Sequence, residues 1–229
     1  MRMKIVECIN VKKSYRQGEI EVHALRDVSL VIEKGEFTAV AGPSGSGKTT
    51  LLNLVGGLDT SDAGSIMVDG KVFNQISQSR LANLRLHKIG FVFQAYNLIP
   101  VLSAAENVEF VMLLQGVSAQ ERQQRAKKIL DDVGLADKYD RRPAELSGGQ
   151  QQRVAVARAI VSDPSIVLAD EPTANLDSET GNGLLEMMKK MNEEKKVTVI
   201  FSTHDKMVMD YARRLVLLRD GRLADDRVK

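Results

Sequence analysis

Residues 42–50 read Gly42-Pro43-Ser44-Gly45-Ser46-Gly47-Lys48-Thr49-Thr50 and follow the apolar run Phe37–Ala41 directly. Residues 42–49 fit the pattern G-x-x-x-x-G-K-[ST], in which a glycine-rich turn lets backbone N–H groups wrap a phosphate. A helix expected to start near Lys48 adds the positive end of its dipole. We expect Lys48 to reach the β- and γ-phosphates of a nucleotide and the Thr49 hydroxyl to ligate Mg²⁺. This segment therefore predicts a site for a nucleoside triphosphate with Mg²⁺.

A second pattern places two acids at the end of a strand. Residues 166–169 are Ile-Val-Leu-Ala, and Asp170 and Glu171 follow them. Adjacent carboxylates at the end of a buried strand are costly unless they meet a cation or a proton. We expect Asp170 to hold Mg²⁺, directly or through its waters, and Glu171 to orient or deprotonate the water that attacks the γ-phosphate. Taken alone, the pattern also fits two solvated acids, but the phosphate loop favours the catalytic interpretation.

The composition is that of a folded protein with a mixed-charge surface. The 229 residues are 43% hydrophobic and 27% charged, with a net charge of +2. Because Lys and Arg form no block or stripe, we expect no nucleic-acid partner. The one cysteine, Cys8, fits a reducing compartment. The longest uncharged stretch, residues 89–105, is interrupted by Gln94 and Pro100 and is too short to span a bilayer, so we expect a cytoplasmic protein.

The order of patterns along the chain predicts an α/β fold. Apolar runs that suit buried strands alternate with helical patterns, which indicates a mostly parallel sheet around the phosphate loop. The first third reads as strands and turns and predicts an antiparallel β subdomain. Capping-box patterns open helices at Ser103 and Ser118. We expect a single domain, with a core of residues 1–94 and 162–229 and an inserted α-helical subdomain of about residues 95–161.

A third motif, Leu146-Ser147-Gly148-Gly149-Gln150, opens a further helix. Ser147 and the N–H groups after it form a helix start whose dipole favours an anion. The motif is the signature of the ATP-binding subunits of ABC transporters, and the chain resembles that family over nearly its whole length. The resemblance implies that the signature closes over the γ-phosphate bound to a second copy of the chain. Two ATP molecules then lie between two copies, and a single copy holds half of each site.

Four further positions match the family in order along the chain. The resemblance implies that Tyr15 stacks on adenine, although a tyrosine at the end of a strand also suits packing. It implies that Gln94 contacts Mg²⁺ and the attacking water and links the site to a membrane partner; the alternative is a strand-end amide. Asp177 matches the aspartate that touches the opposite copy, and otherwise suits a helix N-cap. His204 matches the histidine that contacts the γ-phosphate.

Three stretches are similar to one branch of the family, the lipoprotein-releasing and macrolide-exporting ATPases. They are residues 18–25, 97–108 and 150–159. The resemblance implies an integral-membrane permease as partner, with this chain peripheral on the inner face of the cytoplasmic membrane. The related cell-division ATPases share many of these features, and a soluble ABC ATPase outside transport is a further alternative. We expect the permease to dock near residues 96–102, through Leu98 and Leu102.

Overall fold

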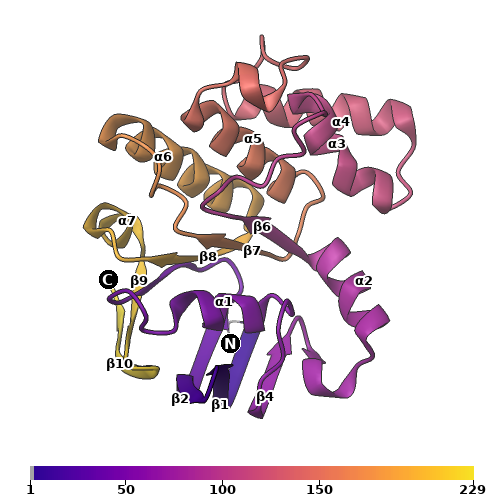
Figure 1. Ribbon diagram of the computed structural model, residues 1–229. Helices are drawn as coiled ribbons and strands as arrows, with labels where there is room; N and C mark the ends of the chain where they lie inside the picture. Colours follow the sequence, from indigo (N-terminus) through magenta and orange to yellow (C-terminus); the bar gives the residue numbers. More distant parts are fainter. Residues whose placement is uncertain (1–2) are drawn as a thin grey trace.

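The computed structural model describes residues 3–229, which form two β-sheets and the helices around them (Figure 1). The first sheet is antiparallel and is built on a long hairpin of β1 and β2, with the strand order β2-β1-β4-β5. Its strands are β1 (Lys4–Gln17), β2 (Ile20–Glu33), β4 (Ala63–Val68) and β5 (Lys71–Val72). The antiparallel β subdomain predicted for the first third of the chain is confirmed.

The second sheet has the strand order β10-β9-β3-β8-β7-β6. Its strands are β3 (Phe37–Ala41), β6 (Ile89–Val92), β7 (Ile166–Asp170), β8 (Thr198–Thr203), β9 (Arg214–Arg219) and β10 (Arg222–Val228). Every neighbouring pair is parallel except β9 and β10. β3 and β8 are buried at every residue, as apolar runs require when both faces of a parallel sheet are covered. The mostly parallel α/β core is therefore confirmed.

Helices cover both faces of this second sheet (Figure 1). α1 (Lys48–Val55) lies between the two sheets, and α3, α4, α5 and α6 lie on the opposite side. The remaining helices are α2 (Gln78–Lys88), α3 (Ala104–Leu114), α4 (Ala119–Asp132), α5 (Gly148–Ile160), α6 (Ser178–Lys195) and α7 (Lys206–Tyr211), with short 3-10 turns at Phe73–Gln75 and Pro143–Glu145. No helix among residues 3–229 is both long and apolar enough to cross a membrane.

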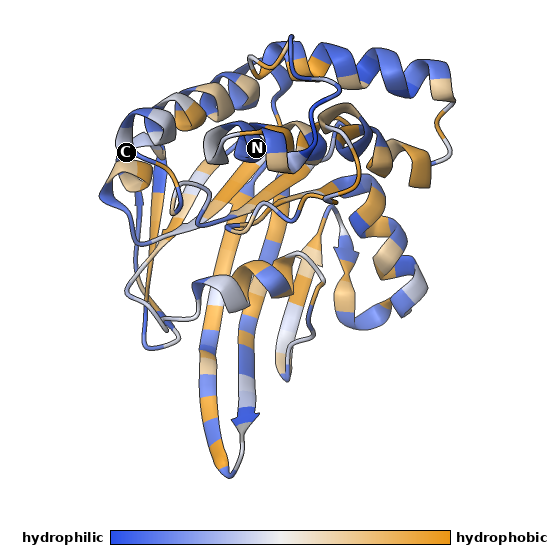
Figure 2. Cartoon of the chain, turned by 45° about the horizontal axis from the view of Figure 1, so that its top comes forward, coloured by the Kyte–Doolittle hydropathy of each residue, from blue (hydrophilic) through white to orange (hydrophobic). Residues whose placement is uncertain are grey.

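Alternate residues of the buried strands serve two hydrophobic cores. Ile166 and Leu168 of β7 pack with α1 and the antiparallel sheet, whereas Val167 and Ala169 pack beneath α5 and α6. This follows from the two-residue period of a strand, which sends neighbouring side chains to opposite faces. Figure 2 shows the result: the strands between the layers are mainly hydrophobic, and hydrophilic residues lie on the outer sides of the helices.

The sequence patterns located most helices but missed α2. Only Leu81 and Leu84 of α2 are buried, so the apolar stripe of this helix is too weak to stand out in the sequence. Both predicted helix starts at Ser103 and Ser118 exist, and each serine accepts a hydrogen bond from the backbone three residues on. The reciprocal bond that completes a capping box is present at Ser103, between its N–H and Glu106.

Asn107 ties the loop before α3 to that helix. Its side chain is fully buried, and its Oδ1 accepts from the Ile99 N–H at 2.7 Å. Its Nδ2 donates to the carbonyls of Ile99, Leu102 and Ser103 at 2.9–3.2 Å. The Ile99 and Ser103 carbonyls also accept from the backbone N–H groups of Leu102 and Asn107, so the Ile99 N–H and the Leu102 carbonyl depend most on this amide. The loop of residues 99–103 therefore depends on this one side chain.

Replacing Asn107 with alanine should lower the free energy of unfolding by about 2–3 kcal/mol, because the Ile99 N–H and the Leu102 carbonyl lose the amide that they bond. Urea denaturation followed by circular dichroism measures this. Asn83→Ala is the matched control, since Asn83 is an exposed residue of α2 and should change stability by less than about 0.5 kcal/mol. Equal effects of the two substitutions would contradict the assigned role.

Candidate functional site

The loop of residues 42–49 joins β3 to α1 and leaves the start of that helix open. Gly47 is the N-cap residue at φ 100°, and no side chain caps the helix. The first N–H groups of an α-helix have no partner within the helix. Because no acid lies in the first turn either, these N–H groups and the helix dipole are free for an anion.

Lys48 carries its charge into this loop. The side chain is buried, and Nζ donates to the carbonyls of Gly42 at 2.9 Å and Pro43 at 3.0 Å. An ammonium has three donors, so one remains, and neutral carbonyls leave its charge uncancelled. Ser46 is also buried, and its hydroxyl has no hydrogen-bond partner among the described residues. Such a group costs about 1–3 kcal/mol, a cost that a phosphate oxygen would remove.

The two strand-end acids meet this loop from β7. Asp170 Oδ1 accepts from the Thr49 hydroxyl at 3.0 Å and from the Ser202 hydroxyl of β8. Glu171 Oε1 lies 2.8 Å from Nδ1 of His204, which follows β8. Glu171 adopts a left-handed backbone at φ 46°, and its N–H donates to the Ser202 carbonyl at 3.1 Å. A left-handed conformation is unfavourable by about 1–2 kcal/mol for a residue with a Cβ, and such strain concentrates at functional sites.

These groups border one open cavity of about 640 Å³. It is lined by Tyr15, Val22, Ala24, Pro43, Ser44, Gly45, Gly47, Lys48, Thr49, Thr50, Gln94, Glu171 and His204. The structure thus brings together Tyr15, the phosphate loop, Gln94, Glu171 and His204, as the sequence predicted. Gln94 follows β6, and its carbonyl accepts from Nδ2 of Asn175 at 2.9 Å. Its side chain is exposed at the cavity.

The signature residues lie elsewhere, at the start of α5. Ser147 is the N-cap: its hydroxyl accepts from the Gln150 N–H at 3.3 Å, and its own N–H donates to Gln150 Oε1 at 3.0 Å. Gly148 and Gly149 follow, and a Cβ at Gly149 would lie 2.3 Å from the Thr180 methyl group. The signature is therefore a partly exposed helix start outside the cavity of its own chain.

Asp177 neighbours the signature through Thr180. It caps α6 and accepts from the Thr180 N–H at 2.9 Å and from the Thr180 hydroxyl at 2.7 Å. These hydrogen bonds hold the pKa of Asp177 below its ordinary value. The N-cap alternative is thus present in the structure, and the contact with a second copy stays a prediction.

Comparisons with known proteins place this site in a family. The sequence profile of the ABC transporter family matches residues 25–174. The chain belongs to the ABC transporter family. An uncharacterized ABC transporter ATP-binding protein of Thermotoga maritima is 49% identical over 220 residues, which is 96% of this chain and 94% of that protein.

The cassette is also similar to a macrolide export protein and to a cassette of solved structure. The macrolide export ATP-binding/permease protein MacB of Aggregatibacter actinomycetemcomitans is 44% identical over 99% of this chain, which spans 35% of that protein. The ATP-binding cassette MJ0796, solved as a dimer in a post-hydrolysis state with ADP and Pi, is 43% identical with a TM-score of 0.91 over 98% of both chains. The cassette is an ATPase that converts ATP to ADP and phosphate.

Some residues of the cassette that shape the cavity escaped the sequence patterns. Val22 of β2 lines it directly across the strand pair from Tyr15. Ser202 holds Asp170, and Asn175 holds the Gln94 carbonyl. The sequence marks Val22 only as an apolar residue on an alternating strand, which does not indicate a place in the cavity. Nothing local in the sequence distinguishes Ser202 or Asn175.

Two glycines of the phosphate loop should respond differently to alanine. Both have positive φ, 77° at Gly45 and 100° at Gly47. A Cβ on Gly47 would lie 2.4 Å from the Ala24 carbonyl oxygen, whereas one on Gly45 would meet nothing within 4 Å. Gly47→Ala should therefore lower the unfolding free energy by at least twice the ~1 kcal/mol expected for Gly45→Ala, and weaken ATP binding more than tenfold. Thermal unfolding and equilibrium ATP binding measure both effects, and equal losses would contradict the close approach.

Proposed function

We propose that two copies of this cassette close around two ATP molecules and thereby drive a membrane-embedded export partner. The observation that carries the proposal is the separation of the two anion sites. The phosphate loop, Glu171 and His204 line the cavity, whereas the helix start at Ser147 does not. A second copy would supply the missing donors. The dimeric form of the solved relative supports this arrangement.

The phosphate end of the cavity is assigned to the loop and α1. Lys48 and the N–H groups of residues 44–50 bind the β- and γ-phosphates, and the Ser46 hydroxyl gains an acceptor. Thr49 and Asp170 offer oxygen donors 3.0 Å apart, and Gln94 lines the same cavity. Such hard oxygen ligands suit Mg²⁺, which binds through one or two carboxylates together with phosphates and waters. When bound there, Mg²⁺ would neutralise charge that develops on the phosphates.

Glu171 and His204 are assigned to the attack by water. Glu171 is largely buried, with 15% of its side chain exposed, and it faces the cavity beside the phosphate loop. A carboxylate held there accepts a proton from water, or orients it in line with the γ-phosphate. The imidazole of His204 fixes the Glu171 side chain through Nδ1, and Nε2 would donate to the γ-phosphate when the ring carries a proton on both nitrogens.

The remaining site residues are assigned to contacts with the nucleotide base and with the second copy of the cassette. Tyr15 lines the cavity and offers the base an aromatic face. Ser147, Gly148 and Gly149 present N–H groups and a hydroxyl to the γ-phosphate of the opposite copy, with Gln150 completing the cap. Asp177 lies beside them and touches the opposite copy.

The relatives support an export partner in the cytoplasmic membrane. The MacB relative is named as an ATP-binding/permease protein for macrolide export, and this chain matches 35% of its length. A cassette of this type would sit on the inner face of the membrane and act on a permease. Release of lipoproteins or efflux of a small molecule is the transport we propose, because the likeness extends to the exporting branch.

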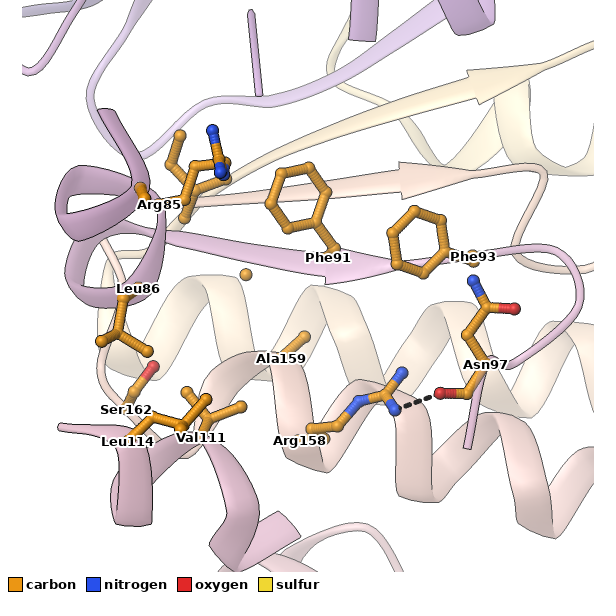
Figure 3. A pocket seen from close by; sticks show the side chains of 13 residues that line it. Arg85, Leu86, Phe91, Phe93, Asn97, Val111, Leu114, Arg158, Ala159 and Ser162 are labelled. Atoms are coloured by element: carbon orange, nitrogen blue, oxygen red, sulfur yellow. Dashed lines mark hydrogen bonds between the residues drawn. The ribbon is translucent and has the colours of Figure 1, made fainter. Parts of the chain in front are cut away.

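A groove beside the nucleotide cavity suits that permease (Figure 3). It measures about 460 Å³ and lies between α2, β6, α3 and α5. Its wall is largely apolar and includes Leu86, Phe91, Phe93, Val111 and Leu114. At one end Arg158 of α5 donates to the carbonyls of Tyr96 and Asn97, the segment that leads back to Gln94. A helix docked in the groove would therefore press on the segment that carries Gln94.

Of the two residues expected to dock the permease, Leu98 needs revision, and the role of Leu102 stays a prediction. Leu98 is half-buried and packs against the core beneath α3 and α5, so it is not a free surface residue. Leu114 of α3 lines the groove and is 59% exposed. It is the better probe of the docking surface, because a charge there need not disturb the core.

Glu171→Gln should bind ATP and accumulate as a dimer, with hydrolysis reduced at least about a hundredfold because the proton acceptor is lost. Size-exclusion chromatography with MgATP and a phosphate-release assay measure the two effects. Glu194→Gln is the control, since Glu194 is an exposed residue of α6 paired with Lys190. Turnover by Glu171→Gln at the wild-type rate would remove Glu171 from the catalytic role.

Leu114→Glu should abolish retention of the cassette on washed cytoplasmic membranes of its source cells while basal ATPase stays within about twofold. A charged side chain in an apolar contact loses binding because it must be desolvated. Leu58→Glu is the matched control, a leucine 47% exposed between α1 and β4 and outside the groove. Unchanged retention of Leu114→Glu, or equal loss in both variants, would contradict docking in the groove.

A further inference from the structure

A cluster of charged residues outside the phosphate loop holds the Tyr15 side chain in place. The Tyr15 hydroxyl donates to Asp59 Oδ2 at 2.8 Å, and Lys13 Nζ donates to Asp59 Oδ1 at 2.9 Å. Lys13 also donates to the Thr60 carbonyl at 2.8 Å, and the Thr60 N–H donates back to Asp59 at 2.7 Å. The carboxylate of Asp59, in the connection between α1 and β4, therefore binds both the Tyr15 hydroxyl and the Lys13 ammonium of β1.

Lys13 also lies over the ring itself. Its Nζ is 5.1 Å from the centroid of Tyr15, within the range of a cation–π contact. Tyr15 is 39% exposed and lines the nucleotide cavity together with Val22, its cross-strand partner. The ammonium occupies one face of the ring, so stacking by a planar ligand is left to the other.

The charges of the cluster favour this fixed arrangement. Lys13 is 8% exposed, which is rare for lysine unless it is paired. Burial works to lower the pKa of Lys13, but the hydrogen bond and charge of Asp59 outweigh it and raise the pKa. Burial likewise works to raise the pKa of Asp59, and the bonds from Lys13, Tyr15 and the Thr60 N–H outweigh it. Both groups thus stay charged, and Asp62 adds a second carboxylate 3.7 Å from Lys13.

We propose that Lys13 and Asp59 are positioning residues that hold the Tyr15 ring as a rigid platform for the nucleotide base. The inference rests on the proposed nucleotide site and on Tyr15 as its base contact. A phenol on an exposed strand would otherwise sample several side-chain rotamers, and ordering it would weaken binding. With Asp59 fixing the hydroxyl and Lys13 covering one face, the ring is ordered before the nucleotide arrives. Stacking of a base on an aromatic side chain then gains its full strength.

The test compares a ligand that has a base with one that does not. Lys13→Met keeps the aliphatic stem and removes the ammonium. Isothermal titration with MgADP and with magnesium pyrophosphate, neither of which the ATPase turns over, gives the two dissociation constants. The dissociation constant for MgADP should rise about threefold to tenfold, while that for pyrophosphate changes less than about twofold.

Two further variants make the test specific. Lys12→Met is the matched control, because Lys12 is exposed and pairs with Asp27 at 3.0 Å instead of with Asp59. It should leave both constants unchanged. In a Tyr15→Ala background, Lys13→Met should have no further effect on MgADP, since the residue through which it acts is gone. If Lys13→Met does not fold, Asp59→Asn carries the same comparison.

Each other outcome overturns the inference. Equal weakening of MgADP and pyrophosphate binding by Lys13→Met would mean that Lys13 acts on the phosphate loop or on the fold. An undiminished effect in the Tyr15→Ala background would mean that it acts independently of the ring. Failure of the underlying site gives a different pattern: Tyr15→Ala alone would leave the MgADP constant unchanged, or Lys48→Ala would leave pyrophosphate binding intact.

Discussion

Parallel pairing of β3, β8, β7 and β6 is the constraint on which the rest of the site depends. Adjacent parallel strands end at the same edge of a sheet, and each of these strands delivers one functional segment there. The phosphate loop follows β3, Asp170 ends β7, His204 follows β8 and Gln94 follows β6. Residues far apart in the chain therefore meet within hydrogen-bond distance, as Thr49 and Asp170 do at 3.0 Å. A slip of one residue in any ladder would turn these side chains to the other face of the sheet.

Lys48 and Asp170 at this edge are held by uncharged partners. Lys48 donates to backbone carbonyls, and Asp170 accepts from two hydroxyls. A direct ion pair between Lys48 and a carboxylate would cancel the charge that phosphate binding needs. Hydrogen bonds to neutral groups orient the same side chains and leave their charge for the ligand. Glu171 adopts a left-handed backbone conformation, which is unfavourable, and its carboxylate faces the cavity in this conformation.

Two helix starts of this cassette have the same dipole but different surroundings. The start of α1 has no side-chain cap and borders the cavity, so its N–H groups are open to a ligand held in the cavity of the same chain. The start of α5 is capped by Ser147 and Gln150 and is partly exposed outside that cavity. An anion bound in that cavity therefore does not lie against it. The two helix starts thus differ in where each begins relative to the six-stranded sheet.

The amino-acid sequence by itself determined the phosphate loop, the buried strands and the signature helix, because each depends on neighbours within a few residues. Glycine spacing, apolar runs and a serine cap are all local patterns. Only the tertiary structure decided the contacts of Lys13 and Tyr15 with Asp59, the place of Val22 opposite Tyr15, and the role of Ser202 beside Asp170. The contacts of Asp59 and Ser202 join segments separated by many residues, and the place of Val22 depends on a strand register that shifts at several points between β1 and β2. No local pattern encodes such a register, so the packing of the whole fold sets it.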